Sequence, residues 1–223
     1  MISNIIPKIN ENYSRHITIV DNFLENPDEI REYALTLSYE ERGSVGVRTK
    51  PATFTPMYES VFEIILNNKI ISNFDTHDDD ISTNGCFQWC NAEIRPVIHA
   101  DHSNRGGVLY LTPNAPSETG TAFYEHIETG HRSIKNLSAT ELDTIFINGH
   151  FDFTPFKEID RVANVYNRLV LFDGRNFHSG TSYFGQTIED SRLFQIFFFE
   201  VDEKNDLQNK HSGKRSIRIN PIK

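Results

Sequence analysis

Residues 96–112, with the sequence PVIHADHSNRGGVLYLT, carry the pattern from which the fold is inferred. An apolar run ends at His99-Ala100-Asp101, a polar turn follows, and a second apolar run begins near Val108. Side chains two positions apart on an extended strand point to the same side, so His99 and Asp101 are predicted to face one side together. An imidazole nitrogen beside a carboxylate oxygen supplies two ligands of a 2-His-1-carboxylate metal site. The alternative is an ordinary strand end that runs into a polar loop.

A metal site of this kind needs a second histidine from a distant segment. The chain has nine histidines, and His178 is the first candidate because it follows the apolar run in LVLFDGRNFHSG. Further candidates are His126 and His131 in EHIETGH and His150 in NGHF. An H-x-D pair alone is weak evidence, since such pairs also occur as ordinary polar contacts at a protein surface.

Arg192 gives the second indication of a functional site. It opens the strand-like run RLFQIFFFEV and shares strand parity with Phe194, Ile196 and Phe198. An arginine at the head of a core-facing row is unusual, because a buried guanidinium needs an acidic partner. A bound dicarboxylate would supply that partner through a bidentate, charge-assisted pair. The other interpretation is an arginine at a strand end whose guanidinium reaches water.

Strand-like segments dominate the chain from Cys86 onward. They are CFQWCNAEIRPVI, GVLYLTP, TAFYEHI, RLVLFDG and RLFQIFFFEV, with turn-rich segments between them. Residues 16–20 alternate and are rich in β-branched side chains, which predicts a further strand. The segment TPFKEIDRVANVYN, residues 154–167, is ambiguous between a short helix and a strand.

Three helices are predicted. The first follows Asn26-Pro27, a good N-cap and a first-turn proline, and its apolar residues recur at helical spacing. The second covers residues 56–68. The third begins with the capping-box pair Ser138 and Glu141 and is predicted to end at Gly149.

The charge balance limits the partners. The chain has 31 acidic and 22 basic residues and a formal net charge of −9. Phosphate binding needs a positive surface, so nucleic acid is not expected as the main partner. The basic stretch NKHSGKRSIR near the C-terminus is expected to be a solvated, flexible end.

Cys86 and Cys90 are too few for a disulfide framework. Four residues apart on one strand they would be too distant to bond, so both are predicted to be small core residues of a reducing compartment. No apolar run approaches the roughly 18 residues of a membrane helix, and the first residues do not resemble a signal peptide. The sequence is therefore expected to belong to a cytoplasmic protein with no membrane partner.

Four pieces of the chain together resemble the iron(II)- and 2-oxoglutarate-dependent oxygenases, most closely their prolyl-4-hydroxylase-like branch. The pieces are PVIHADHSNRGGVLYLT, ETGTAFYEH, NRLVLFDGRNFHSG and SRLFQIFFF. They give an H-x-D, a Tyr-Leu strand, a Gly-Thr segment, an apolar strand that leads to a histidine, and a later arginine. The resemblance implies an α+β fold, mainly β, with a double-stranded β-helix core of the jelly-roll or cupin-like type and supporting N-terminal helices.

This resemblance also implies a single oxygenase-like domain over residues 1–223. Residues 1–85 would supply the helical support and an edge strand, and residues 202–223 a C-terminal tail. The jelly-roll core would cover residues 86–201, with an insertion near residues 130–160.

The resemblance assigns roles to individual residues. His99, Asp101 and His178 match the iron ligands, and Arg192 matches the basic residue that pairs with the far carboxylate of 2-oxoglutarate. The implied cofactors are Fe²⁺, the cosubstrate 2-oxoglutarate and O2, with ascorbate as a supporting reductant. The implied reaction converts 2-oxoglutarate to succinate and CO2 and hydroxylates an amino-acid side chain or a small metabolite.

Asn91 and Thr121 fall near positions where this branch often places polar groups beside the cosubstrate, although the backbone could equally satisfy both. The chain departs from the family pattern in three ways. The gap between Asp101 and His178 is long, the segment YFGQTIEDS lengthens the turn before Arg192, and Phe194 replaces a serine or threonine found in some branches. These departures leave the branch and the substrate open.

Two other classes remain possible from the residues. One is a cupin-like metalloprotein, an isomerase or another dioxygenase, that does not use 2-oxoglutarate and has no need of Arg192. The other is a metal-free binding β-sandwich. The expected partner is a small-molecule or peptidyl substrate, around which Tyr110, Tyr124 and Tyr183 could shape a pocket, and the oligomeric state is open.

Overall fold

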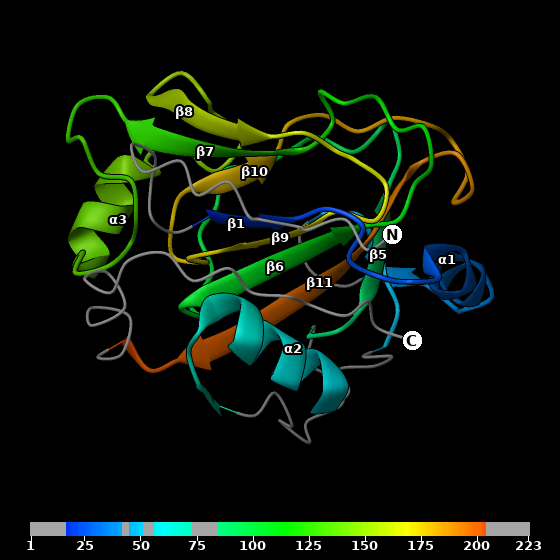
Figure 1. Ribbon diagram of the computed structural model, residues 1–223. Coiled ribbons are helices and arrows are strands. Elements are labelled where there is room, and N and C mark those ends of the chain that lie inside the picture. The colour runs from blue at the N-terminus through cyan, green and yellow to red at the C-terminus, as the bar shows by residue number, and fades with distance from the viewer. Residues whose placement is uncertain (1–16, 42–44, 51–55, 73–83, 204–223) are drawn as a thin grey trace.

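A computed structural model describes residues 17–41, 45–50, 56–72 and 84–203. Within these ranges the fold is mainly β with three helices, α1 (Pro27–Leu35), α2 (Pro56–Leu66) and α3 (Ala139–Ile145) (Figure 1). The strands are β1 (Ile17–Val20), β2 (Glu40–Glu41), β3 (Val47–Arg48), β4 (Ile70–Ser72), β5 (Phe87–Cys90), β6 (Arg105–Tyr110), β7 (Thr121–His126), β8 (Phe156–Val162), β9 (Leu169–Phe172), β10 (His178–Gly180) and β11 (Arg192–Val201).

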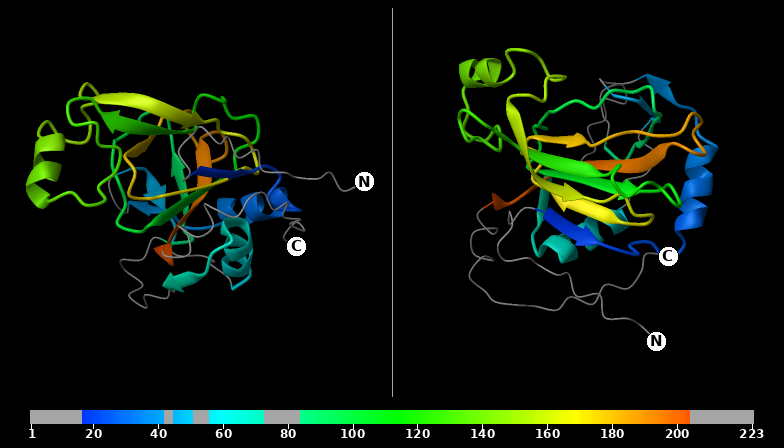
Figure 2. Two further views of the ribbon diagram at one scale, coloured as in Figure 1. Left: turned by 60° about the vertical axis from the view of Figure 1, so that its left-hand side comes forward. Right: turned by 90° about the horizontal axis from the view of Figure 1, so that it is seen from above.

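The strands form two sheets whose neighbouring strands are all antiparallel. The larger sheet has the order β1-β9-β6-β11-β5-β3-β2, with β4 paired to one end of β11, and the smaller has the order β10-β7-β8. The smaller sheet lies over one face of the larger sheet (Figure 2). These two layers make the double-stranded β-helix, which confirms the predicted mainly-β fold class.

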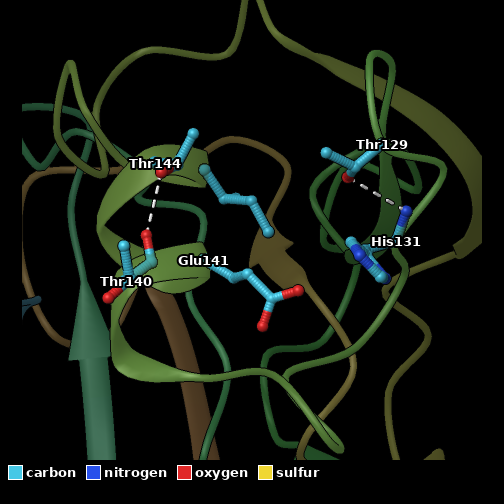
Figure 3. Close-up of a pocket in the computed structure, with 6 residues that line it drawn as sticks. Thr129, His131, Thr140, Glu141 and Thr144 are labelled. Carbon is cyan, nitrogen blue, oxygen red and sulfur yellow. Dashed lines mark hydrogen bonds between the residues drawn. The ribbon is translucent and has the colours of Figure 1, made fainter.

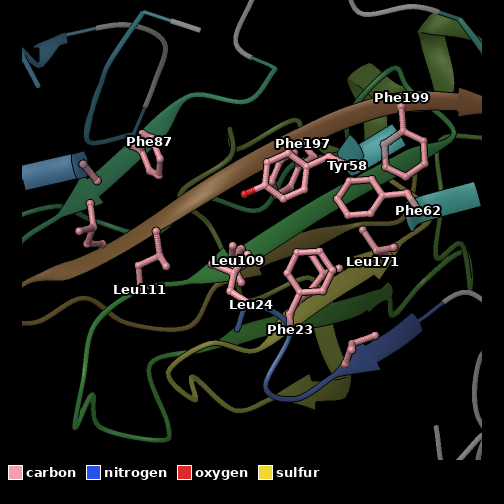
Figure 4. Packing of buried hydrophobic residues seen from close by; sticks show 14 of the residues in the cluster. Phe23, Leu24, Tyr58, Phe62, Phe87, Leu109, Leu111, Leu171, Phe197 and Phe199 are labelled. Atoms are coloured by element: carbon pink, nitrogen blue, oxygen red, sulfur yellow. The ribbon is translucent and has the colours of Figure 1, made fainter. Parts of the chain in front are cut away.

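Both faces of the larger sheet are buried, because β11 is apolar at nearly every position. Leu193, Phe197 and Phe199 point to the outer face, where α1 and α2 pack (Figures 1 and 4). The ring of Phe62 in α2 lies 5.1 Å from Phe197 and 5.4 Å from Phe199 between centroids. Burial of each such ring is worth about 1.5–3 kcal/mol, so this aromatic layer holds the helices on the sheet.

The alternate residues of β11 point the other way, into the space between the sheets. Phe194 and Ile196 belong to this inner cluster together with Val108, Val170 and Phe172. Arg192 shares their face, as its strand parity predicts. Cys86 and Cys90 are also buried in the inner cluster as free thiols, which confirms them as core residues.

Helix α3 lies in the long connection between β7 and β8. Its capping box is present, since the Ser138 hydroxyl accepts from the Glu141 amide and the Glu141 carboxylate accepts from the Ser138 amide. The predicted end at Gly149 is wrong, because the helix stops at Ile145. The ring of Phe146 packs against Phe156 and Phe177, at 5.5 and 5.6 Å, so tertiary packing ends the helix one turn early.

Several other boundaries differ from the sequence prediction. The strand expected from residue 86 to residue 98 ends at Cys90, and the ambiguous segment 154–167 contains strand β8. The short strands β2 and β3 were not predicted. Asn26 is the N-cap of α1 but makes no side-chain capping bond. Nearly all of the predicted C-terminal tail, residues 202–223, lies outside the described residues.

The helices carry no sign of a membrane segment. In the parts of the chain that the structure covers, no helix is both long enough and apolar enough to cross a bilayer.

Candidate metal centre

His99, Asp101 and His178 meet where the end of the smaller sheet approaches the larger one. Each offers a ligand atom, and these atoms all lie within 4.8 Å of one another. Nε2 of His178 is 3.5 Å from Oδ2 of Asp101, and Nε2 of His99 is 3.9 Å from Oδ1. Bonds of about 2.1 Å would put neighbouring ligands of one ion roughly 3 Å apart. Small movements of the three side chains toward one another would therefore let them bind a single metal ion.

Backbone pairing brings the two histidines together. His99 and His178 form an isolated antiparallel bridge, in which each backbone N–H donates to the carbonyl of the other, at 3.0 and 2.8 Å. The prediction that His99 and Asp101 lie on one regular strand is wrong, because the chain is irregular from Asn91 to Asp101 apart from this bridge. The side chains converge because the bridge fixes His99 and because the amide of Asp101 donates to the carbonyl of Gly174 at 2.8 Å.

Hydrogen bonds to backbone carbonyls set the tautomer of both imidazoles. Nδ1 of His99 is 3.2 Å from the Val97 carbonyl, and Nδ1 of His178 is 2.7 Å from the Asn176 carbonyl. A carbonyl oxygen can only accept, so the proton sits on Nδ1 and Nε2 keeps its lone pair. Histidine ligands of metals are oriented in this way. Both Nε2 atoms therefore keep a lone pair that can bind a metal ion.

The electrostatics of the cluster favour a bound cation. Burial lowers the pKa of His99, and the nearby His178 lowers it further, so the imidazole of His99 is neutral. Burial raises the pKa of Asp101, and the charges of His178 and Arg48 oppose that rise. A metal ion needs neutral imidazoles and an ionised carboxylate. An ion between the three side chains would relieve the burial of the carboxylate charge.

Arg192 is buried without a counter-ion. Only 3% of the residue is exposed, and within the covered part of the chain no carboxylate pairs with it. Its Nη2 donates to the Gly120 carbonyl at 3.2 Å and to the Thr121 hydroxyl at 3.4 Å, while its Nε has no hydrogen-bond partner. An uncompensated buried charge costs several kcal/mol. The free donor therefore fits a carboxylate that arrives with a ligand.

Aromatic rings surround this guanidinium. Its central carbon lies 4.3 Å from the ring centre of Phe194, 5.4 Å from Tyr110 and 5.5 Å from Tyr183. Rings at these distances stabilise a cation in part and keep water away, but they do not neutralise its charge. Tyr110 and Tyr183 thus line the space beside Arg192, whereas Tyr124 packs in a separate cluster around α3.

The two loosely predicted cosubstrate residues have different environments. The Thr121 hydroxyl contacts Arg192 and also lies 2.8 Å from the Tyr110 hydroxyl. The side-chain oxygen of Asn91 accepts from the Glu93 amide at 3.2 Å within a turn, and no hydrogen bond among the described residues joins Asn91 to Arg192. The structure thus brings Thr121 to Arg192 but does not bring Asn91 there. Roles of both residues toward 2-oxoglutarate stay predictions.

Arg48 is a site residue that sequence reasoning did not identify. It lies in β3, and its Nε donates to the Gln88 side-chain oxygen at 2.7 Å. Its charge acts on the pKa of Asp101 and on that of His99, so the guanidinium lies near the triad. The alternation in VGVRT is a weak strand signal, but nothing local shows that this strand pairs with β5.

Among the described residues, the other candidate histidines do not belong to the ligand cluster, although His150 is hydrogen-bonded to Ile98, next to His99. Nδ1 of His126 is 2.9 Å from the Thr129 hydroxyl, and Nδ1 of His150 donates to the Ile98 carbonyl at 2.8 Å. His131 and Glu141 enter a separate cavity of about 130 Å³ from opposite sides (Figure 3). Because no member of the triad lines this cavity, it is not where the predicted chemistry would occur.

Solved structures with the same fold bind the predicted cosubstrate. A crystal structure of HygX from Streptomyces hygroscopicus with nickel and 2-oxoglutarate bound is 10% identical, covers 82% of each chain and has a TM-score of 0.51. A second HygX structure, with nickel, 2-oxoglutarate and hygromycin B bound, has the same identity and coverage and a TM-score of 0.50. A prolyl hydroxylase from Trichoplax adhaerens, in complex with a hypoxia inducible factor peptide fragment, is 14% identical over 90% of this chain and 89% of its own, with a TM-score of 0.47.

At these identities the likeness establishes the fold. The chain is structurally similar to iron(II)/2-oxoglutarate oxygenases and shares their double-stranded β-helix, as the order of its motifs predicts. A shared fold does not by itself assign a reaction.

Sequence comparison places the chain more specifically. No curated protein matches it. A family model described as "Family of unknown function (DUF6445)" matches residues 7–191, a span that contains the whole triad. Because this match covers most of the chain, the protein belongs to the family of unknown function DUF6445.

Proposed function

We propose that the protein is an iron(II)- and 2-oxoglutarate-dependent dioxygenase that hydroxylates an amino-acid side chain or a small metabolite. In this proposal His99, Asp101 and His178 hold the iron, and Arg192 binds the far carboxylate of 2-oxoglutarate. The observation that carries the proposal is the buried guanidinium of Arg192, which has a free donor and no carboxylate partner among the residues described.

The donor set of the triad fits iron(II). Two imidazole nitrogens and one carboxylate oxygen are a donor set that would suit non-heme iron(II), and His99, Asp101 and His178 would hold it. Bound iron(II) with 2-oxoglutarate supplies the activation of O2 and the oxidative decarboxylation that gives succinate and CO2. The contribution of the protein is therefore to bind, to orient and to exclude water.

Each side chain has a defined part in this arrangement. The carbonyls of Val97 and Asn176 hold the imidazoles so that Nε2 faces the metal position. Arg192 would form a charge-assisted pair with the cosubstrate carboxylate. The rings around Arg192 exclude water, and a pair of charges is stronger where water is excluded.

Arg192 also favours this function over the alternatives. A cupin-like metalloprotein that does not use 2-oxoglutarate would gain nothing from a buried arginine that has no carboxylate partner among the described residues. A metal-free β-sandwich would gain nothing from three ligating atoms within 4.8 Å of one another. The oxygenase proposal uses both features, and it assigns succinate and CO2 as products.

An anaerobic titration tests the proposal. Iron(II) and 2-oxoglutarate are added to the protein, and the visible charge-transfer absorption of the chelated metal is followed. We expect this band in the parent protein and in Asp143→Ala, which removes an exposed carboxylate on α3. We expect it to be lost in Asp101→Ala. A folded parent protein that develops no band would exclude the oxygenase function, and a band that survives Asp101→Ala would exclude this ligand set.

A further inference from the structure

Arg48 lies on the inner face of the larger sheet, the face that packs toward the smaller sheet. In the antiparallel pairing, Arg48 stands opposite Gln88 in β5, and Gln88 stands opposite Phe194 in β11. Directly opposed residues point to the same face, and so do residues two apart on one strand. Arg48 therefore shares a face with Phe194 and with Arg192. This is the face that packs toward the smaller sheet.

The guanidinium of Arg48 is held so that its terminal nitrogens stay free. Its Nε donates to the Gln88 oxygen at 2.7 Å, and the Gln88 amide nitrogen in turn donates to the Val45 carbonyl at 2.7 Å. The orientation of Gln88 is therefore fixed. No hydrogen bond in the described chain uses the two terminal nitrogens of Arg48. These two nitrogens form a fork of the kind that binds a carboxylate with two parallel bonds.

The charge of Arg48 is not neutralised by its neighbours. Its hydrogen-bond partner is a neutral amide, and within the described ranges no carboxylate forms an ion pair with it. Its charge opposes the raised pKa of Asp101 and, together with Arg192, the raised pKa of Tyr183. Its place on the inner face of the larger sheet and its influence on both groups put the Arg48 charge on the same side of the sheet as Arg192.

With iron(II) and 2-oxoglutarate bound, the charges of the site would balance without Arg48. Iron(II) and Arg192 carry three positive charges, while Asp101 and the 2-oxoglutarate dianion carry three negative charges. The metal and Arg192 thereby take both carboxylates of the cosubstrate. The positive charge of Arg48 remains, and burial, which lowers the pKa of its guanidinium, partly removes that charge from water. Such a charge attracts an anionic group from the next ligand to enter.

We propose that Arg48 is the residue that recognises the primary substrate, and that this substrate is a small molecule with a free carboxylate. The inference rests on the proposed oxygenase function. The terminal nitrogens of Arg48 would bind the carboxylate in bidentate fashion, and Gln88 would keep the fork in place. If Arg48 had only a structural role, its bond to Gln88 would be sufficient. Replacing Arg48 would then leave the ligand selectivity of the protein unchanged.

The experiment uses matched acids and amides as probes. The protein is loaded with redox-inert zinc(II) and saturated with 2-oxoglutarate, whose binding is measured first. Ligand-observed saturation-transfer NMR then screens the free and N-acetylated L-amino acids beside their primary amides, which differ only in the charge of that group. We expect acids to bind the parent protein and their amides not to bind. Binding by neither series, or equally by both, would overturn the proposal.

Three variants locate the effect. For Arg48→Gln we expect the affinity for the best acid to fall about tenfold or more, with 2-oxoglutarate affinity unchanged. Arg48→Lys keeps the charge without the fork, so it should retain part of the acid affinity. Arg161→Gln removes an exposed arginine of β8 and should change nothing at the site. Thermal unfolding of each variant confirms that it is folded.

The variants also separate the two proposals. Loss of 2-oxoglutarate affinity in Arg48→Gln, or acid binding that survives this substitution, would overturn the role of Arg48 while leaving the oxygenase function intact. A loaded parent protein that fails to bind 2-oxoglutarate at all would overturn the oxygenase function and the substrate inference with it.

Discussion

The backbone amide of Asp101 donates to the carbonyl of Gly174 at 2.8 Å, and the two residues pack closely. A Cβ atom on Gly174 would lie 3.2 Å from Cβ of Asp101 and 2.7 Å from the Ser103 carbonyl. The second distance is shorter than a packed protein tolerates, so any side chain at Gly174 must displace the loop that carries Asp101. Gly174 therefore positions a residue of the candidate metal centre without touching the metal.

We expect Gly174→Ala to weaken metal binding by about tenfold or more, because support residues around a metal site have effects of this size. The measurement is a competition titration of iron(II) or cobalt(II) against a coloured chelator. Gly130→Ala is the control, since the space around Gly130 is open, although its positive φ makes alanine costly for stability. Parent-like affinity in Gly174→Ala would show that the loop around Asp101 adapts.

Arg192→Met should stabilise the ligand-free protein. The substitution removes a buried charge that has no counter-ion among the described residues and places an apolar side chain among Tyr110, Tyr183 and Phe194. We expect the free energy of unfolding to rise by about 1–3 kcal/mol, the scale found when buried charges give way to apolar groups. Urea unfolding without metal or cosubstrate measures this change. A clear loss of stability would mean that Arg192 has a counter-ion in the folded protein.

Thr121→Val tests the predicted role of the Thr121 hydroxyl. That hydroxyl accepts from Arg192 at 3.4 Å and lies 2.8 Å from the Tyr110 hydroxyl, so it helps to orient the guanidinium. We expect 2-oxoglutarate affinity to fall by about 3- to 10-fold, because a hydrogen bond of this length should contribute about 0.7–1.4 kcal/mol, within the range of ordinary intramolecular hydrogen bonds. Anaerobic titration of the iron(II)-loaded protein gives the affinity. An unchanged value would assign Thr121 a purely structural role.

The ion pairs of Glu203 with Lys135 and Arg175 predict how stability depends on pH. Glu203 accepts from Lys135 at 2.9 Å and from Arg175 at 2.5 Å, and these bonds lower its pKa to about 2. The stability that Glu203 contributes is therefore present above its ordinary pKa of 4.5 and is lost as the pH falls toward about 2. At pH 7 we expect Glu203→Gln to cost about 0.5–1 kcal/mol, since the group is half-exposed.

Urea unfolding of Glu203→Gln and of the parent protein at several pH values measures this contribution. The difference between them should shrink from pH 4.5 to pH 2, and Glu128→Gln, at an exposed site, should show no such trend. A difference that stays constant over this range would mean that the Glu203 carboxylate is not ionised in the pairs.

The fold could be predicted because many separate segments of the sequence carry strand patterns or motifs that point to it. The alternation in β11 marks two buried faces, and the order of H-x-D, His178 and Arg192 carries the resemblance to a known architecture. The structure brings His99, Asp101 and His178 together and buries Arg192 on the face of the larger sheet that packs toward the smaller sheet. The convergence of the triad has a different cause from the one expected, since a single bridge and the Gly174 contact replace a regular strand.

Arg48 escaped prediction because its position depends on long-range pairing. Strand β3 has only two residues, and its neighbour β5 lies about forty positions away, so no local pattern marks the pair. The end of α3 was misjudged for a related reason, since the packing of Phe146 overrides the glycine signal. The side-chain oxygen of Asn91 accepts a hydrogen bond within a local turn, and the role of Asn91 toward the cosubstrate stays a prediction.

The binding of 2-oxoglutarate to the anaerobic protein, measured by calorimetry with and without iron(II), tests the central claim most directly. We predict tight binding only when iron(II) is present. In Arg192→Gln we predict an affinity at least about 30-fold weaker, as expected when one partner of a buried charge pair is removed, with the affinity for iron(II) unchanged. Binding that is independent of iron(II), or equally tight in Arg192→Gln, would contradict the assignment of the triad and Arg192 to one shared site.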